Sequence, residues 1–320
     1  MSGPAGTAIL SVAIRPRSSD DAQKLAEALQ QLMAEDPVLR VRPDELAGHV
    51  VIGGTSEQHL GAIVDRVRRE FDVEASVGRP EVIYREAVMR PADGETKYAR
   101  PAGGGGQYAH VKIHLYPGEP GTGYIFENEV TQGSIPREFI KPIDEAIKEA
   151  LTRGVLAGYP IDDVRIVLYD GSYHDVDSSE AAFRTAGALA AQEAARKAEP
   201  VLLEPVMRVD AVVPADGVHD VVKDLVARRG QIRTSHDRGD TYVLRALVPL
   251  AELFDYATDF RSRTHGYGTY TMQFDAYAPL HVSDDDEDRD SVVGAPRKPA
   301  PNLRDSSVAL PEPEADGAGN

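Results

Sequence analysis

The sequence predicts an α+β fold in which two modules with the same order of elements flank a central module of a different kind. Within residues 7–78, apolar residues alternate or recur at helical spacing in the order strand, helix, strand, strand, helix, strand. The same order returns, with unrelated residues, within 201–279. It is the βαββαβ order of the ferredoxin-like fold. We therefore divide the chain into modules 1–78, 79–200 and 201–279, with a tail at 280–320.

The flanking modules show their elements through apolar spacing and helix-capping residues. Ser18 or Ser19 can cap the first helix, and Thr55 with Gln58 resembles a capping box before the second. Asp216 can cap the first helix of the last module. The expected elements, in chain order, are a strand at 10–14, a helix with apolar positions at 22–33, strands at 38–41 and 49–53, a helix at 60–67 and a strand at 71–77, then a strand at 207–213, a helix at 218–225, strands at 232–236 and 242–248, a helix at 250–257 and a strand at 270–274.

The central module is expected to combine strands with two helices. Pro136 can start one helix and Gly154 can stop it. Asp177 with Glu180 can open the other, whose apolar face is rich in alanine and glycine and so allows close packing of the backbone. The strands are expected at 111–116 and 164–168.

Charge limits the partners that the chain can have. The formal net charge is −17, which argues against nucleic acid because affinity for phosphate comes largely from Lys and Arg. Residues 281–320 hold 10 Asp or Glu and 4 Lys or Arg, so −6 of this charge belongs to the tail. The tail lacks periodic apolar residues, and we expect it to be disordered.

Several kinds of chemistry are missing from the sequence. It has 0 Cys, which excludes disulfides and Cys nucleophiles. It has no phosphate-binding loop of the form GxxxxGK(S/T), no HExxH motif and no metal-ligand spacing among its 9 His. We therefore expect neither an enzyme nor a cofactor or metal site. No apolar run of about 18 residues and no signal peptide is present, so we expect a cytoplasmic protein without a membrane partner.

One loop of the central module is a candidate functional segment. Ser172, Tyr173, His174 and Asp175 follow a strand and precede a helix, where free N–H groups and the helix dipole favour anions. The aspartates of this loop could serve only as turn and cap residues. His174 has no evident structural role, and loops often carry function.

Long motifs, in register, resemble elongation factor G, a family of translational GTPases. Leu168–Phe183 and Gly103–Lys112 resemble domain IV of that family. Other matching stretches are 35–37, 63–66 and 74–78, similar to domain III, and 204–208, 227–231, 248–259 and 261–264. The resemblance covers about 7–279 in the order III, IV, V, and it does not include domains I (the GTPase) and II.

The resemblance implies a role on the ribosome. In the family, the tip of domain IV enters the decoding region and stabilises the tRNA–mRNA pair as it moves. The matching tip residues are Gly104, Gly105, Gly106, Gln107, Ser172, Tyr173, His174 and Asp175. We expect electrostatic contacts with ribosomal RNA from Arg228, Arg229, Arg261 and Arg263. The implied partners are the ribosome, ribosomal RNA and the tRNA–mRNA complex, with GTP held only by a separate GTPase partner, if there is one.

Some positions depart from the family pattern. Four glycines, Gly103 to Gly106, stand where members usually have a basic or polar residue in the loop. Arg15 replaces a usual Glu, residues 56–61 read SEQHLG in place of GELHLE, and Tyr267 stands between two glycines where a basic residue is common. Fewer basic contacts at the tip should weaken phosphate-driven binding.

Three alternatives stay open at the level of sequence. The chain could be an acidic protein-interaction or regulatory factor that kept the scaffold and lost ribosome function. It could be a ribosome-protection factor, although those relatives usually have a differently built tip. It could also be a fragment of a longer gene. Whether the chain promotes, blocks or monitors translocation is a further open choice.

Overall fold

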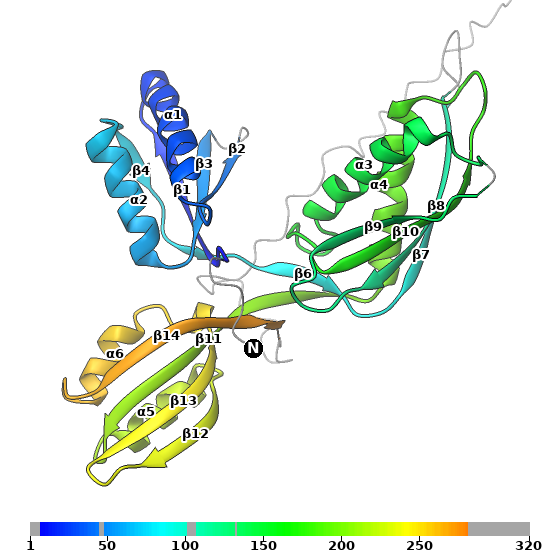
Figure 1. Ribbon diagram of the computed structural model, residues 1–320. Helices are drawn as coiled ribbons and strands as arrows, with labels where there is room; N and C mark the ends of the chain where they lie inside the picture. The colour runs from blue at the N-terminus through cyan, green and yellow to red at the C-terminus, as the bar shows by residue number, and fades with distance from the viewer. Residues whose placement is uncertain (1–6, 45–47, 101–106, 132, 281–320) are drawn as a thin grey trace, which may run out of the picture.

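The computed structural model of the protein describes residues 7–44, 48–100, 107–131 and 133–280 (Figure 1). It contains three sheets, each with helices packed on it, and the α+β class expected from the sequence is confirmed. Of the expected tail at 280–320, the structure describes Leu280, whose N–H donates to the Leu202 carbonyl, and residues 281–320 lie outside the described residues. No helix in the described ranges is long and apolar enough to cross a membrane.

The first module forms an antiparallel sheet in the order β2-β3-β1-β4. Alternate residues of β1 face two helices and are buried, because side chains of a strand point to opposite faces. Ser18 caps α1 as expected, but Ser56, and not Thr55 with Gln58, accepts the N–H of His59 at the start of α2. The elements are β1 (Leu10–Pro16), α1 (Ser19–Glu35), β2 (Arg40–Asp44), β3 (His49–Gly54), α2 (Glu57–Glu70) and β4 (Ala75–Val77).

The last module repeats this topology in the order β12-β13-β11-β14. Two details of the sequence prediction were wrong. Asp216 does not cap α5, which begins after Gly217 without a side-chain cap. The helix expected at 250–257 is split at Asp255, whose φ of 61° lies in the left-handed region. The elements are β11 (Pro200–Pro214), α5 (Val218–Ala227), β12 (Gln231–Asp237), β13 (Thr241–Pro249), a 3₁₀ turn η1 (Leu250–Glu252), α6 (Tyr256–Arg263) and β14 (Thr269–Pro279).

The central module has a sheet in the order β7-β8-β10-β9, with only β9 parallel to its neighbour. Two helices, α3 and α4, pack against each other and against the sheet (Figure 1). Gly187 permits this contact, since a Cβ there would lie 3.1 Å from the Cγ2 atom of Ile143. Ser179, and not Asp177, caps α4 by accepting the N–H of Ala182. The elements are β7 (Ala92–Arg100), β8 (Gln107–Pro117), β9 (Tyr124–Asn128), α3 (Arg137–Thr152), β10 (Val164–Ser172) and α4 (Glu180–Lys197).

Residues 81–88 connect all three modules. Strand β5 (Glu81–Val82) pairs with β1, and β6 (Arg85–Val88) pairs with β11. Between these strands, the ring of Tyr84 lies 5.5 Å from the ring of Tyr159 in the central module. Because this segment belongs to two sheets, the domain boundaries expected at residues 78, 200 and 279 stay predictions.

Glu86 ties this connection to the central module. Its side chain is fully buried, and its two carboxylate oxygens accept five backbone N–H groups, those of residues 155–159, at 2.6 to 3.2 Å. The neighbouring Arg85 pairs with Asp162 at 2.8 Å and lies over the ring of Tyr277 in β14. Glu86 and Arg85 thus attach residues 155–162 of the central module to strand β6, which pairs with β11 of the last module.

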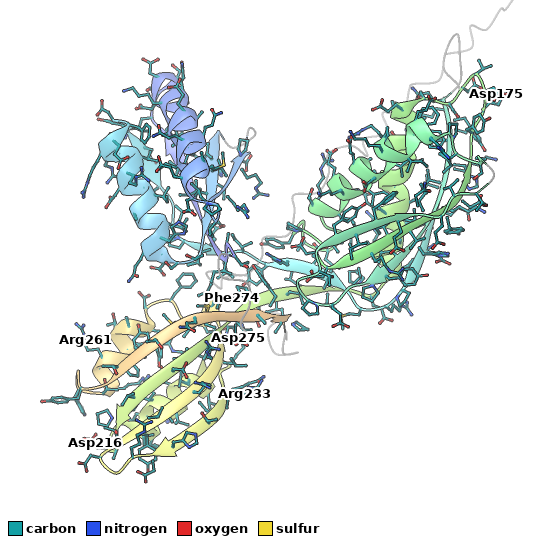
Figure 2. The ribbon with its side chains drawn as sticks, in the orientation of Figure 1. Asp175, Asp216, Arg233, Arg261, Phe274 and Asp275 are labelled. Carbon is teal, nitrogen blue, oxygen red and sulfur yellow. The ribbon has the colours of Figure 1, made fainter. Side chains whose placement is uncertain are left out.

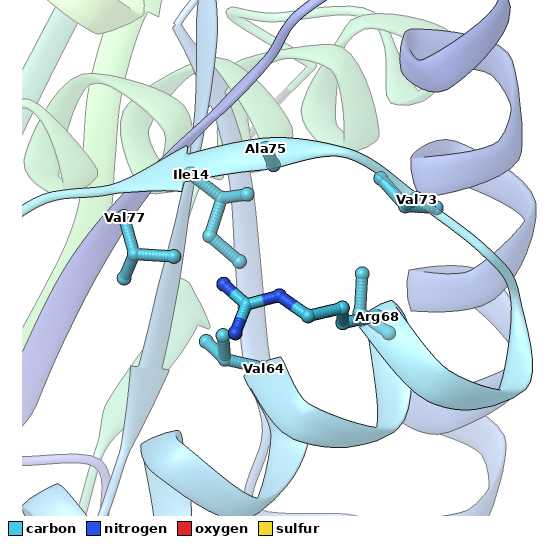
Figure 3. Close-up of a pocket in the computed structure, with 7 residues that line it drawn as sticks. Ile14, Val64, Arg68, Val73, Ala75 and Val77 are labelled. Carbon is cyan, nitrogen blue, oxygen red and sulfur yellow. The ribbon is translucent and has the colours of Figure 1, made fainter.

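Two hollows lie away from the central module's free end. An open groove of about 1210 Å³ is lined by β1, the start of α2, the 250–258 turn and β14. A gap of about 10 Å³ lies between α2 and β4 (Figure 3), where the stem of Arg68 crosses toward Ile14 and Val77. The gap has roughly the volume of one water molecule, so it is a packing defect and not a ligand site.

Candidate RNA-contacting tip of the central module

Residues Arg100 and Gln107, which border 101–106, lie at the same end of the central module as the 173–179 loop. The register pairs Arg100 with Gln107 at the end of the β7–β8 hairpin, and Ser172 with His110 on the adjacent strands. Asp175 lies at the end of this module that points away from the other two (Figure 2). Gln107 is exposed and accepts a hydrogen bond from the hydroxyl of Tyr98. The predicted contact residues Gly104, Gly105 and Gly106 lie outside the described residues.

The 173–179 loop is fastened to β8 through Ser178. The Ser178 hydroxyl donates to the carbonyl of Tyr108 at 2.8 Å and accepts the N–H of His174 at 2.9 Å. The Tyr108 N–H donates to the carbonyl of Asp177 at 2.8 Å, and the Ser178 N–H donates to the carbonyl of His174 at 3.1 Å. These four bonds close the loop on itself and on the sheet, so the loop presents its side chains from a fixed backbone.

His174 has a structural role that the sequence did not reveal. Its Nδ1 atom accepts the backbone N–H groups of Val176 and Asp177 at 3.3 and 3.2 Å. An Asp177 carboxylate oxygen also lies 3.2 Å from Nδ1, but a nitrogen that accepts N–H bonds cannot carry the proton of an ion pair. We therefore assign the proton to Nε2, the nitrogen left without a partner inside the turn. The side chain is 56% exposed, so Nε2–H is available to a ligand.

Ser172 supports the tip from below. It ends β10, is half-buried, and its hydroxyl lies 2.8 Å from the Tyr108 hydroxyl and 3.3 Å from Nδ1 of His110. The other nitrogen of His110 lies 2.8 Å from a carboxylate oxygen of Glu95. Ser172 therefore belongs to a polar network on the open face of the sheet, with an anchoring role for the loop.

The exposed surface of the tip is made by other residues. Tyr173 and Val176 are 43% and 81% exposed, and Asp175 is exposed. Asp177, and not the adjacent Asp175, is the carboxylate beside the imidazole of His174. Val176 was not predicted, since a single valine in a polar loop has no pattern that marks it as exposed. Within the described ranges, no three metal-ligating side chains converge.

Comparison with known families finds three matches along the chain. Residues 6–79 match elongation factor G domain III, residues 80–199 match elongation factor G domain IV, and residues 201–287 match the elongation factor G C-terminus. The chain belongs to the elongation factor G family. The resemblance inferred from the motifs is confirmed, and no GTPase domain is among the matched parts.

A solved structure is also similar to this chain. A crystal structure of a protein from Thermus thermophilus is 39% identical, with a TM-score of 0.61. The alignment covers 86% of this chain and 41% of that protein. The chain thus spans less than half the length of this relative. The loop described above is the tip of domain IV.

In domain V, most of the arginines predicted to contact RNA are held by carboxylates. Arg229 forms a two-bond pair with Glu204 at 2.9 and 2.8 Å. Arg228 binds Asp224 at 3.0 Å and also Asp259, and its side chain is 15% exposed. Arg263 pairs with Asp224 at 3.0 Å. Arg261 is exposed and has no ion pair with another described residue, so it is the arginine best placed for an external anion.

Proposed function

We propose that this elongation factor G relative binds the ribosome near the A site and acts in or modulates movement of the tRNA–mRNA complex. The observation that carries the proposal is the locked loop at the tip of domain IV. It holds the imidazole of His174 in one tautomer, with Nε2–H free for a partner, and the ring of the preceding residue, Tyr173, is exposed. Membership of the elongation factor G family supports the ribosome as the partner.

The chemistry of the tip fits bases and riboses better than phosphates. The Asp177 carboxylate lies beside the imidazole of His174, and Asp175 is the next residue in the sequence, so a phosphate oxygen would be repelled there. A ring can stack on an unpaired base, and Nε2–H can donate to a base edge or to a 2′-hydroxyl. We therefore assign the RNA contact of this loop to Tyr173 and His174, with Ser172 as their support. Gln107 and the adjacent glycines would form the other side of the contact.

Attraction to the phosphate backbone then has to come from side chains outside this loop. Arg261 is our candidate in domain V, because Arg228, Arg229 and Arg263 already neutralise carboxylates. Arg261 by itself would add about one released counterion to the salt dependence of the affinity. The partners in this proposal are the ribosome, its RNA and the tRNA–mRNA complex in the cytoplasm, with any GTPase activity supplied by another polypeptide.

The test separates the ring of His174 from its role in the turn. Asparagine can also accept backbone N–H groups two and three residues ahead, so His174→Asn keeps the turn and removes the ring. We expect wild type to pellet with ribosomes at low salt and His174→Asn to bind about 5- to 30-fold more weakly, the loss expected for one stacking contact of about 1–2 kcal/mol. His219→Ala, which removes an exposed histidine of α5, is the matched control and should bind like wild type.

A second assay reports on translocation. Messenger movement is followed with the full-length elongation factor present, with and without this protein, and the His174→Asn variant should lose most of the effect of wild type. If wild type stays in the supernatant at low salt, the ribosome proposal fails. The acidic interaction factor then becomes the better account, because the net charge of −17 already favours it.

A further inference from the structure

Three groups compete for one nitrogen of His174. The N–H groups of Val176 and Asp177 lie 3.3 and 3.2 Å from Nδ1, and a carboxylate oxygen of Asp177 also lies 3.2 Å from it. An imidazole nitrogen without a proton accepts hydrogen bonds, whereas a nitrogen with a proton can only donate one. The backbone N–H groups therefore need Nδ1 without a proton, and the carboxylate needs Nδ1 with one. The two sets of contacts exclude each other.

The neutral imidazole closes the turn. With the ring proton on Nε2, Nδ1 is bare and both backbone N–H groups donate to it. The turn at 174–177 then satisfies its own donors, and the only ring donor that it offers to a partner is Nε2–H. In this form the Asp177 carboxylate faces an uncharged ring.

A second proton on the ring, taken from water, exchanges these contacts. Nδ1–H then donates to the Asp177 carboxylate, so a charge-assisted hydrogen bond replaces the two backbone bonds. The N–H groups of Val176 and Asp177 lose their acceptor and have to turn to water or to a ligand. The exchange needs no new neighbour, because every partner already lies within 3.3 Å of Nδ1.

The rest of the loop does not depend on the imidazole. The Ser178 hydroxyl binds the Tyr108 carbonyl and the His174 N–H, and backbone bonds join Tyr108 to Asp177 and Ser178 to His174. None of these four bonds uses a ring nitrogen, so they persist when the ring is protonated. The change is therefore confined to residues 175–177, and the loop keeps its place on the sheet.

Few charges other than that of Asp177 act on this ring. Asp175 is its other acidic neighbour in the loop. From the sheet, the ring of Tyr108 in β8 lies 6.5 Å away, and the Lys97 ammonium of β7 lies 5.7 Å from that tyrosine ring. Among the residues that the structure describes, Asp177 alone has a charged atom within 4.0 Å of the imidazole. Residues 101–106, outside the described ranges, contain no charged or titratable side chain.

We propose that protonation of His174 switches the tip of domain IV between a closed turn and an open, cationic one. Imidazole is the side chain that ordinarily changes its charge between about pH 5 and pH 8, so the switch operates near neutral pH. The closed form offers one ring N–H, which suits a base edge or a 2′-hydroxyl. The open form adds a positive charge and two backbone N–H groups, which suit a phosphate oxygen. The switch regulates the loop of the proposed function, and its effect on RNA rests on that proposal.

Nuclear magnetic resonance of the full chain, without ribosomes, tests the switch. With ¹⁵N-labelled histidine, a ring nitrogen that carries a proton is distinguished from one that does not, and His174→Asn identifies the His174 signal. At about pH 8 we expect a bare Nδ1 and a protonated Nε2. As pH falls, Nδ1 should gain its proton, and the backbone amide signals of Val176 and Asp177 should move with the same midpoint. In His174→Asn these amide signals should stay in place.

Matched variants separate the two forms of the turn. Asp177→Asn removes the carboxylate that stabilises the open form, so the midpoint should move to lower pH. Asp175→Asn removes the adjacent carboxylate, which is not beside Nδ1, and should move the midpoint less. His110 reaches the loop through Ser172 and also titrates, so His110→Gln is the control, and it should leave the Val176 amide moving with the His174 ring.

The outcomes distinguish this inference from the proposed function. A proton on Nδ1 at about pH 8, or amide signals of Val176 and Asp177 that do not follow the ring, would overturn the switch and leave the ribosome proposal to its own test. The effect on RNA is measured by pelleting at about pH 8 and about pH 6, where wild type should gain affinity relative to His174→Asn. An equal gain in both proteins would refute that effect. If wild type does not pellet at all, the ribosome proposal fails and the switch remains as a property of the free protein.

Discussion

Removing the carboxylate of Glu86 should destabilise the base of domain IV by several kilocalories per mole. Glu86 is 0% exposed, and its two oxygens accept the N–H groups of residues 155–159. A buried donor left without an acceptor costs about 1–3 kcal/mol, and charge-assisted bonds are the stronger ones. Parts of the 155–159 turn are exposed, so water can replace some of the five bonds. We expect Glu86→Ala to cost about 3–5 kcal/mol of unfolding free energy, as for other buried charges removed from their partners.

The Glu86→Gln variant separates the contribution of the carboxylate charge to stability from that of the side-chain shape. The amide oxygen can serve the three N–H groups that Oε1 now accepts, from residues 157–159. The amide NH₂ would then face the N–H groups of Val155 and Leu156, which Oε2 accepts at 2.6 and 3.0 Å. Two donors would meet with no acceptor between them, so we expect a loss of about 2–3 kcal/mol. Glu129→Ala, at an exposed glutamate whose side chain forms no ion pair within the described ranges, is the control and should stay within about 0.5 kcal/mol of wild type.

The measurement combines urea unfolding with hydrogen exchange. A chain of several modules need not unfold in one step, so the exchange rates of the 155–159 amides give the local stability directly. In Glu86→Ala these amides should exchange faster, while those of α5 keep their protection. Wild-type stability in both Glu86 variants, together with unchanged protection of the 155–159 amides, would show that the carboxylate is not what holds this turn.

Three further outcomes are expected. The protein alone should show no micromolar binding of GTP by calorimetry, because the sequence has no phosphate-binding loop; a measurable affinity would contradict this. Cutting the chain after Leu280, whose N–H donates to the Leu202 carbonyl, should shift the melting temperature by no more than a few degrees. The cut should also strengthen ribosome binding at low salt, because it removes a net charge of about −6. A large fall in melting temperature would mean that the tail docks on the rest of the protein. Burial alone would raise the pKa of Asp36, but bonds from the Val38 N–H and the His59 imidazole outweigh it and hold this pKa below its ordinary value. The contribution of Asp36 to stability is therefore present above the unfolded pKa of about 3.9 and is lost as pH falls through the lower folded pKa. We expect the difference in unfolding free energy between wild type and Asp36→Asn to narrow only below about pH 4. A difference that is unchanged down to about pH 2 would refute the lowered pKa of Asp36.

The sequence by itself determined the order of elements in domains III and V. Their strands and helices follow from apolar residues at spacings of two and of three to four, a pattern that depends only on which face is buried. The residues that cap the helices were predicted less accurately than the order of the elements. Ser18 was predicted correctly, but Ser56, Ser179 and Gly217 precede helices that were assigned to neighbouring residues. Several adjacent polar residues can each cap a helix, and only the backbone angles of the finished turn decide which one does.

Tertiary structure alone decided what the candidate site residues do. His174 was found from its place in a loop, but its bonds to the Val176 and Asp177 N–H groups exist only because the chain turns back there. Arg228 and Arg229 looked like free cations until the fold brought Glu204, Glu252 and Asp259 beside them from 23 to 31 residues away. A charge pattern along a chain records which side chains are present. Which of them remain available to RNA depends on long-range neighbours that no local spacing reveals.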